Sequence, residues 1–154
     1  MSAEPLAPSL LKSDTVRFAH ASERQFARLL DFYQIGWEYE PTSFDIGWDR
    51  DGNVVQRFTP DFYLVEFDLY IEITTLNQKL VTKKNRKARR LRELHPEIQI
   101  KVLYQRDYLH LLVKYGLELP SQLEPSDVAG DLPTRLDLRP DPAPLPGDTE
   151  AETA

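Results

Sequence analysis

The first regular pattern along the chain is a series of apolar residues at helical spacing. Between residues 21 and 36 an apolar stripe recurs every three to four positions, formed by Phe26, Leu29, Leu30 and Tyr33. Ser22 followed by Gln25 three residues later is typical of a capping box, and Gly36 marks the end of the stripe. The pattern predicts one helix over this range.

Short apolar runs separated by turn signals follow this helix. They predict strands at WEYEP, FDIGW, NVVQRF, DFYLV and DLYIEIT, which lie within residues 37–74. Asp51-Gly52 is a turn signal between the second and third runs, and the short segment 66–68 separates the last two. The prediction is a set of short strands, with the last two paired across a tight turn.

The period becomes helical again from about Asn77. One face of a predicted helix is apolar, formed by Leu80, Ala88, Leu91 and Leu94. A strand over residues 98–104 and a last helix between Asp107, its predicted cap, and Gly116 complete the pattern. This order of elements predicts an α/β fold with a central mixed sheet of four to five strands flanked by helices.

The composition narrows the class of protein. The 154 residues are 41% hydrophobic and 29% charged, which is typical of one soluble globular domain. No apolar run approaches the roughly 18 residues of a membrane helix, so no membrane association is expected. The chain has no cysteine, which excludes disulfides, thiolate nucleophiles and cysteine-ligated zinc and fits a cytoplasmic protein.

Charge is distributed unevenly along the chain. Residues 119–154 hold eight acidic side chains against two arginines and are rich in proline, so this segment is predicted to be a disordered tail that adds little to the fold. Residues 1–15 are predicted to be a loose arm. The domain between them, residues 16–118, is close to neutral overall.

Two acids lie inside apolar strand patterns. Asp61 follows Pro60 at the start of one predicted strand, and Glu72 interrupts the next. Two carboxylates brought close repel each other unless a cation lies between them. Mg²⁺, with Mn²⁺ as the alternative, prefers oxygen ligands, and the carbonyl of Ile73 offers a third. A metal held in this way activates water and polarises phosphoryl oxygens, which is the chemistry of phosphodiester hydrolysis.

The order of these motifs resembles the PD-(D/E)XK nuclease superfamily, which has the restriction-endonuclease-like fold and includes junction resolvases and transposon end-cleaving nucleases. The resemblance covers residues 19–115, with Pro60-Asp61 as the PD motif and Glu72-Ile73-Thr74 as the second motif. It implies a glutamate on the first helix, which Glu23 matches, and dimers or a partner protein.

Thr74 stands where the superfamily usually has a lysine. The resemblance implies that this lysine orients water or stabilises developing charge, which threonine cannot do. Two interpretations remain open. Lys79, Lys83 or Lys84 at the start of the following helix reaches back and takes the role, or the site has decayed and only binding survives.

The second predicted helix is strongly basic. Residues 79–92 hold eight basic side chains and no acid. A run of one sign repels itself unless a polyanion is present, so a DNA backbone is the expected partner. The residues expected to bind it are Lys79, Lys83, Lys84, Arg86, Lys87 and Arg90.

The sequence therefore predicts a metal-dependent DNA endonuclease of the kind used in repair, recombination or mobile-element processing. Its expected catalytic residues are Glu23, Asp61, Glu72, Thr74, Lys79 and Lys83, and its expected metal ligands are Asp61, Glu72 and Ile73. Two alternatives stay open. The chain is a non-catalytic nucleic-acid-binding module on a nuclease scaffold, or a regulatory domain whose acidic tail competes for its own basic helix.

Overall fold

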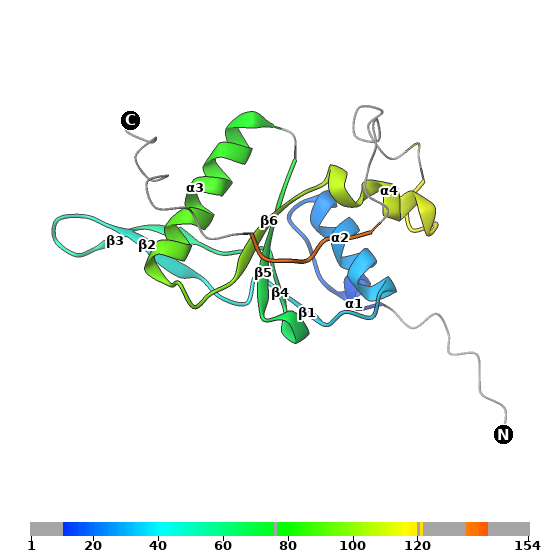
Figure 1. The fold of residues 1–154 in the computed structure, drawn as a ribbon, viewed down its shortest axis with the longest axis horizontal. Coiled ribbons are helices and arrows are strands. Elements are labelled where there is room, and N and C mark those ends of the chain that lie inside the picture. The colour runs from blue at the N-terminus through cyan, green and yellow to red at the C-terminus, as the bar shows by residue number, and fades with distance from the viewer. Residues whose placement is uncertain (1–10, 76, 120, 122–134, 142–154) are drawn as a thin grey trace, which may run out of the picture.

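A mixed four-stranded sheet forms the centre of the molecule (Figure 1). The computed structural model describes residues 11–75, 77–119, 121 and 135–141. In spatial order the strands are β1 (Trp37–Tyr39), β4 (Phe62–Leu64), β5 (Leu69–Thr74) and β6 (Ile100–Tyr104). β4 pairs antiparallel with β1 and with β5, whereas β5 and β6 are parallel. The predicted α/β class and mixed sheet are confirmed.

The tight turn and the crossover between these strands follow from local chemistry. Between β4 and β5 the chain makes one turn of 3₁₀ helix, η1 (Val65–Phe67), and Asp68 adopts a left-handed conformation with φ of 47°. Parallel strands need a long crossover, which α3 (Gln78–Leu94) supplies between β5 and β6. Asn77 caps α3, because its side chain accepts hydrogen bonds from the backbone N–H groups of Lys79 and Leu80.

Two further strands form a separate ribbon. β2 (Phe44–Trp48) and β3 (Val54–Phe58) pair only with each other in the described structure and project from the body of the molecule (Figure 1). At the tip, the Asp49 carboxylate accepts the backbone N–H groups of Asp51 and Asn53, both at 2.9 Å, and Gly52 has a φ of +86°. We call residues 44–58 the β2–β3 ribbon.

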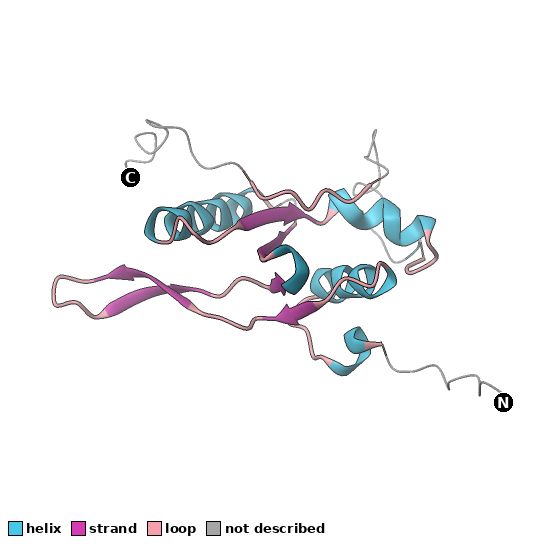
Figure 2. Ribbon diagram, turned by 60° about the horizontal axis from the view of Figure 1, so that its bottom comes forward, coloured by secondary structure: helices cyan, strands magenta, loops and turns pink. Residues whose placement is uncertain are grey.

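Helices cover both faces of the sheet. α2 (Ala21–Phe32) and α4 (Arg106–Lys114) lie on one face, and α3 lies on the other with the ribbon, as both views show (Figure 2). The larger core joins α2 and α4 to inward residues of the sheet such as Phe62 and Ile71. The smaller core joins α3 and the ribbon through residues such as Ile46, Phe58 and Leu91.

The alternation of side chains along β5 determines which residues face α2 and α4 and which face α3. Leu69, Ile71 and Ile73 belong to the core with α2 and α4, while Tyr70 packs against the core with α3. Because successive strand residues point to opposite faces, Glu72 and Thr74 lie on the same face as Tyr70. The glutamate therefore belongs to the face that α3 covers.

Several predicted helix details are wrong. α2 is preceded by His20 as its N-cap, and Ser22 lies inside the helix, so no capping box forms there. α4 begins at Arg106, one residue before the predicted cap. On α3, Leu80 is 44% exposed and Val81 is buried in its place. None of the described helices is long and apolar enough to cross a membrane.

The described part of the N-terminal segment is folded rather than loose. Lys12–Thr15 form a short helix, α1, in which Ser13 is buried. The Ser13 N–H donates to the Asp31 carboxylate at 2.9 Å, and the Lys12 ammonium donates to the Trp37 carbonyl. The prediction of a loose arm is therefore wrong for residues 11–15, and residues 1–10 lie outside the described residues.

Residues 135–141 lie against the body of the molecule, although composition places them in a disordered tail. Leu136 and Leu138 pack against the larger core. The Asp141 carboxylate accepts the N–H of Val102 in β6 at 2.9 Å. The prediction of disorder fails for this segment because a few well-placed side chains suffice to dock it. Most of the rest of 119–154 lies outside the described residues.

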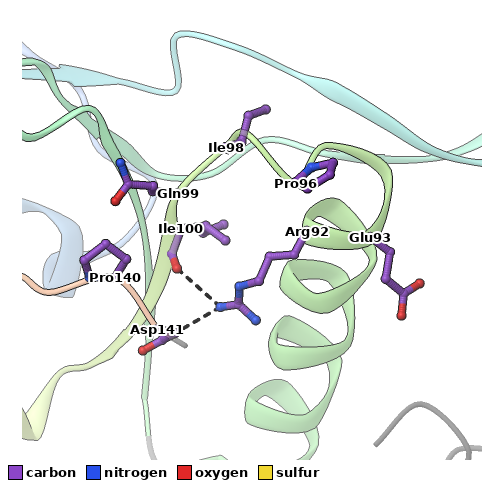
Figure 3. Close-up of a pocket in the computed structure, with 8 residues that line it drawn as sticks. All are labelled: Arg92, Glu93, Pro96, Ile98, Gln99, Ile100, Pro140 and Asp141. Carbon is purple, nitrogen blue, oxygen red and sulfur yellow. Dashed lines mark hydrogen bonds and ion pairs between the residues drawn. The ribbon is translucent and has the colours of Figure 1, made fainter. Parts of the chain in front are cut away.

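Asp141 also joins two basic side chains, and we call Asp141, Arg92 and Lys101 the Asp141 cluster. Arg92 of α3 lies 3.3 Å from the Asp141 carboxylate and also donates to the carbonyl of Ile100 at 3.3 Å (Figure 3). The Lys101 ammonium lies 3.6 Å from the same carboxylate. The cluster borders a hollow of about 340 Å³ between the end of α3 and Pro140.

Candidate functional site

Asp61 and Glu72 face each other across the β4–β5 pair. The register Phe62↔Ile71 places Asp61, one residue before β4, opposite Glu72. The N–H of Asp61 donates to the Glu72 carboxylate at 3.2 Å, and the N–H of Ile73 donates to the Asp61 carboxylate at 2.8 Å. Each carboxylate is thus held by the other strand's backbone. We call these two residues the acidic pair.

Burial disfavours the charged forms of the acidic pair. Glu72 is only 7% exposed, and burial, followed by the nearby Asp61 carboxylate, raises the pKa of Glu72 to about 8. Burial is also the main cause that raises the pKa of Asp61 to about 6, with Glu23 adding to it. A hydrogen bond from Ile73 and the charge of Lys84 act in the opposite direction. The charge of Lys84 therefore only partly offsets the effects that raise the two pKa values.

Glu23 lies in the first turn of α2 and is 3% exposed. Its carboxylate accepts a hydrogen bond from the Tyr39 hydroxyl, and burial together with this bond raises the pKa of Tyr39. Its charge also raises the pKa of Asp61, so the structure brings Glu23 within electrostatic reach of the acidic pair. Within the described ranges, however, no three Asp, Glu or His side chains form a ready metal-binding group.

Lys84 is the lysine that reaches the acidic pair. Its ammonium lies 3.5 Å from the Glu72 carboxylate and donates to the carbonyl of Ile73. The Thr74 side chain is buried, and its hydroxyl donates to the carbonyl of Thr75 at 3.3 Å. Of the three lysines that the sequence offers in place of the one missing at Thr74, Lys84 is therefore the one whose contacts fit.

The position of Lys84 follows from the buried face of α3. Val81, Ala88 and Leu91 are the buried residues of this helix, and Lys84 lies between the first two at spacings of three and four. Its long stem runs along the covered face, and its ammonium ends at the acidic pair. The signal in the sequence is a lysine at an otherwise apolar helical position. This signal can be recognised only if Val81, rather than Leu80, is taken as part of the buried face.

Three of the six residues expected to bind DNA line a groove, while the other three, Lys84 among them, do not. A hollow of about 450 Å³ is lined by Gln56, Gln78, Lys79, Thr82, Lys83 and Arg86. We call it the basic groove. Arg90 instead donates to the carbonyl of Ile46 at 3.0 Å and pairs with Glu93 at 3.5 Å. Lys87 is half-buried and is not among the residues that line the groove.

A pair of glutamines behind Thr74 was not predicted. Gln25 of α2 is buried and accepts a hydrogen bond from the Gln105 side chain at 2.8 Å. The N–H of Gln105 donates to the carbonyl of Thr74 at 2.8 Å. This link ties the end of β5 to α2, near Glu23. The signal in the sequence is weak, because the pattern of Ser22 and Gln25 indicates a capping box and not a contact with Gln105.

Comparisons with protein-family models, with curated proteins and with solved structures find no match to this chain. The resemblance to PD-(D/E)XK nucleases therefore depends on the motifs and on the arrangement described above.

Proposed function

We propose that the protein is a metal-dependent endonuclease that hydrolyses phosphodiester bonds in DNA. The observation that carries the proposal is the acidic pair itself. The buried Glu72 carboxylate lies opposite the half-buried Asp61 carboxylate, both have raised pKa values, and Lys84, which reaches Glu72, also contacts the carbonyl of Ile73. Such a site is built to receive positive charge.

The donor set fits Mg²⁺. Two carboxylates and a backbone carbonyl are all oxygen ligands, and Mg²⁺ commonly binds through one or two carboxylates while it keeps several waters. Asp61, Glu72 and the carbonyl of Ile73 would hold it. Once bound, the ion would polarise a phosphoryl oxygen and lower the pKa of water. Neutralising the pair would also remove the repulsion that raises the pKa of Glu72.

Lys84 supplies the positive group that Thr74 lacks. Its ammonium lies at the edge of the acidic pair, where its N–H donors stabilise negative charge that develops on the phosphate or on the attacking oxygen. Glu23, tied to Tyr39, acts through its charge on Asp61 rather than through a contact with substrate. Lys79 and Lys83 take a binding role in the basic groove instead of a catalytic one.

DNA cleavage assays test the proposal. Supercoiled, linear, branched and single-stranded DNA are incubated with the protein in Mg²⁺, in Mn²⁺ and in chelator, alongside Asp61→Asn. We expect metal-dependent cleavage by the parent and none by Asp61→Asn, which keeps the size and hydrogen-bonding capacity of the side chain. DNA binding without cleavage under every condition would instead favour the non-catalytic binding module. Equal cleavage by both proteins would place the active site elsewhere.

A further inference from the structure

The basic groove has two walls from different elements. Gln56 comes from β3 of the β2–β3 ribbon, and the other lining residues come from the first half of α3. The ribbon wall is fixed in place. Arg90 of α3 donates to the carbonyl of Ile46, and Ile46 and Phe58 are buried against α3. The wall from the ribbon is therefore held to α3 by a hydrogen bond and by core packing.

The lining of the groove is uniform in chemistry. Each of its six side chains carries a hydrogen-bond donor, three of them are cationic and none is acidic. The ribbon carries three acids, but Asp45 pairs with Arg57 at 2.9 Å, and Asp49 and Asp51 lie at its tip, where Asp49 accepts backbone N–H groups. A concave, donor-rich surface of this kind suits a polyanion.

Gln56 lines the groove, and the residue opposite it in the ribbon is a glycine, which leaves room for its side chain. Gly47 pairs with Gln56, and a Cβ at Gly47 would come within 3.0 Å of the Gln56 Cβ. An amide both donates and accepts, so it can contact a base edge or a sugar hydroxyl, whereas ammonium groups only donate. Gln56 can thus make contacts that the cationic side chains of the groove cannot make.

We propose that the basic groove holds a DNA strand between the ribbon and α3, with Lys79, Lys83 and Arg86 on phosphates and Gln56 facing the strand from the ribbon. The inference rests on the proposed function for its ligand, and the groove and the acidic pair share α3, in which Lys83 lines the groove and the next residue, Lys84, contacts Glu72. It adds the ribbon to the substrate-binding surface, which was assigned from sequence to α3 alone.

Two variants on neighbouring residues of β3 test the ribbon's part with the same change in net charge. Gln56→Glu adds a negative charge toward the groove. Arg57→Gln removes a positive charge from the other face of the strand, where Arg57 pairs with Asp45. Binding of a fluorescein-labelled 20-base-pair duplex is measured in chelator at 50 mM salt, with the full chain carrying Asp61→Asn so that no cleavage interferes. Both residues are exposed, and circular dichroism checks that each variant is folded.

We expect Gln56→Glu to weaken binding by about tenfold, because like charges a few ångströms apart repel at this scale, and Arg57→Gln to stay within about twofold of the parent. Lys83→Gln should reduce the slope of log affinity against log salt by about 0.9. Equal losses for the two β3 variants, or no DNA binding by the parent, would overturn the inference. If the expected pattern of binding is found but the protein never cleaves DNA in Mg²⁺, DNA binding in the groove is supported and the proposed nuclease function is wrong.

Discussion

The acidic pair and the Asp141 cluster both combine carboxylates, basic side chains and backbone N–H groups, but the ratio of carboxylates to basic side chains is reversed between them. In both, a carboxylate accepts a backbone N–H from a strand of the central sheet, from Ile73 in one case and Val102 in the other. In both, a basic side chain of α3 reaches a carboxylate, Lys84 at Glu72 and Arg92 at Asp141.

The balance of charge separates them. One ammonium meets two carboxylates at the acidic pair, with Glu23 adding more negative charge, whereas one carboxylate meets two cations in the Asp141 cluster. A docked chain segment is stabilised when its charge is fully matched. A surplus of buried negative charge costs stability unless a cation arrives, which supports the proposed metal site at the acidic pair.

The largest expected effect is the loss of cleavage in Glu72→Gln. The variant keeps the size of the side chain but removes a charge from the acidic pair, and we expect cleavage to fall by about 10³-fold or more, since both a metal ligand and its charge are lost. The measurement is the initial rate in Mg²⁺ with saturating DNA. A rate within tenfold of the parent would show that Glu72 is as structural as Asp141.

Lys84→Ala should lower the saturated rate by about 10²-fold, the scale of losing one preorganised donor to developing charge. Lys84 also lowers the pKa of Glu72 and Asp61, so its removal should shift the acid side of the pH–rate profile upward. Lys83→Ala is the contrast, because it should raise the DNA concentration needed for half-maximal rate instead. Identical kinetics for the two variants would remove Lys84 from the site.

The stability of the metal-free protein should fall as pH rises from about 5 to about 8. The pKa of Glu72 is raised to about 8 and that of Asp61 to about 6, so the folded protein keeps protons that the unfolded chain has already released. This contribution to stability is complete below the unfolded pKa values, near 4, and is lost through the folded ones. Melting temperature against pH measures it.

Two additions sharpen this measurement. Mg²⁺ should raise the melting temperature more at pH 8 than at pH 5, because protonated carboxyl groups do not bind it. Glu72→Gln should flatten the fall with pH. A metal-free melting temperature that rises from pH 5 to pH 8 would contradict the charge surplus at the acidic pair.

The smallest expected effect lies in the Asp141 cluster. Asp141→Ala removes a hydrogen bond to β6 and two ion pairs, so we expect a loss of about 1–2 kcal/mol in the free energy of unfolding. Cleavage should be unchanged. Asp137→Ala is the matched control, because Asp137 pairs only with the exposed Arg139 among the described contacts of its carboxylate. Equal stability of the two variants would show that the contacts of Asp141 do not stabilise the fold.

The sequence predicts the strands and the two acids within them well because both depend on local pattern. Period-two alternation and a three-residue turn indicate that the two strands pair, but the register that places Asp61 opposite Glu72 is known only from the structure. The separate ribbon was not predicted, because a strand's partners depend on distant contacts such as that between Arg90 and Ile46. The docked segment 135–141 was not predicted because the composition of the whole tail is polar and rich in proline. Composition does not indicate that Leu136, Leu138 and Asp141 contact the folded domain.

Lys84 shows the limit most clearly. Residues 79–92 read as one basic stretch, and choosing among its lysines requires knowing which face of α3 is buried. Leu80 and Val81 are both apolar neighbours, and taking Leu80 turns the predicted face by one residue, about 100°. The sequence therefore leaves Lys79, Lys83 and Lys84 as equal candidates for the role of the missing lysine and also counts all three among the DNA-binding residues.

The many contacts of α3 also limit how its length can vary over evolutionary time. Its covered face directs Lys84 to the acidic pair, an outer face lines the groove with Lys79 and Lys83, and its end presents Arg92 to Asp141. One residue inserted between Lys84 and Ala88 would turn the two halves relative to each other by about 100°. Exposed polar helices usually tolerate drift, but here substitutions should be far easier to accept than a single insertion or deletion.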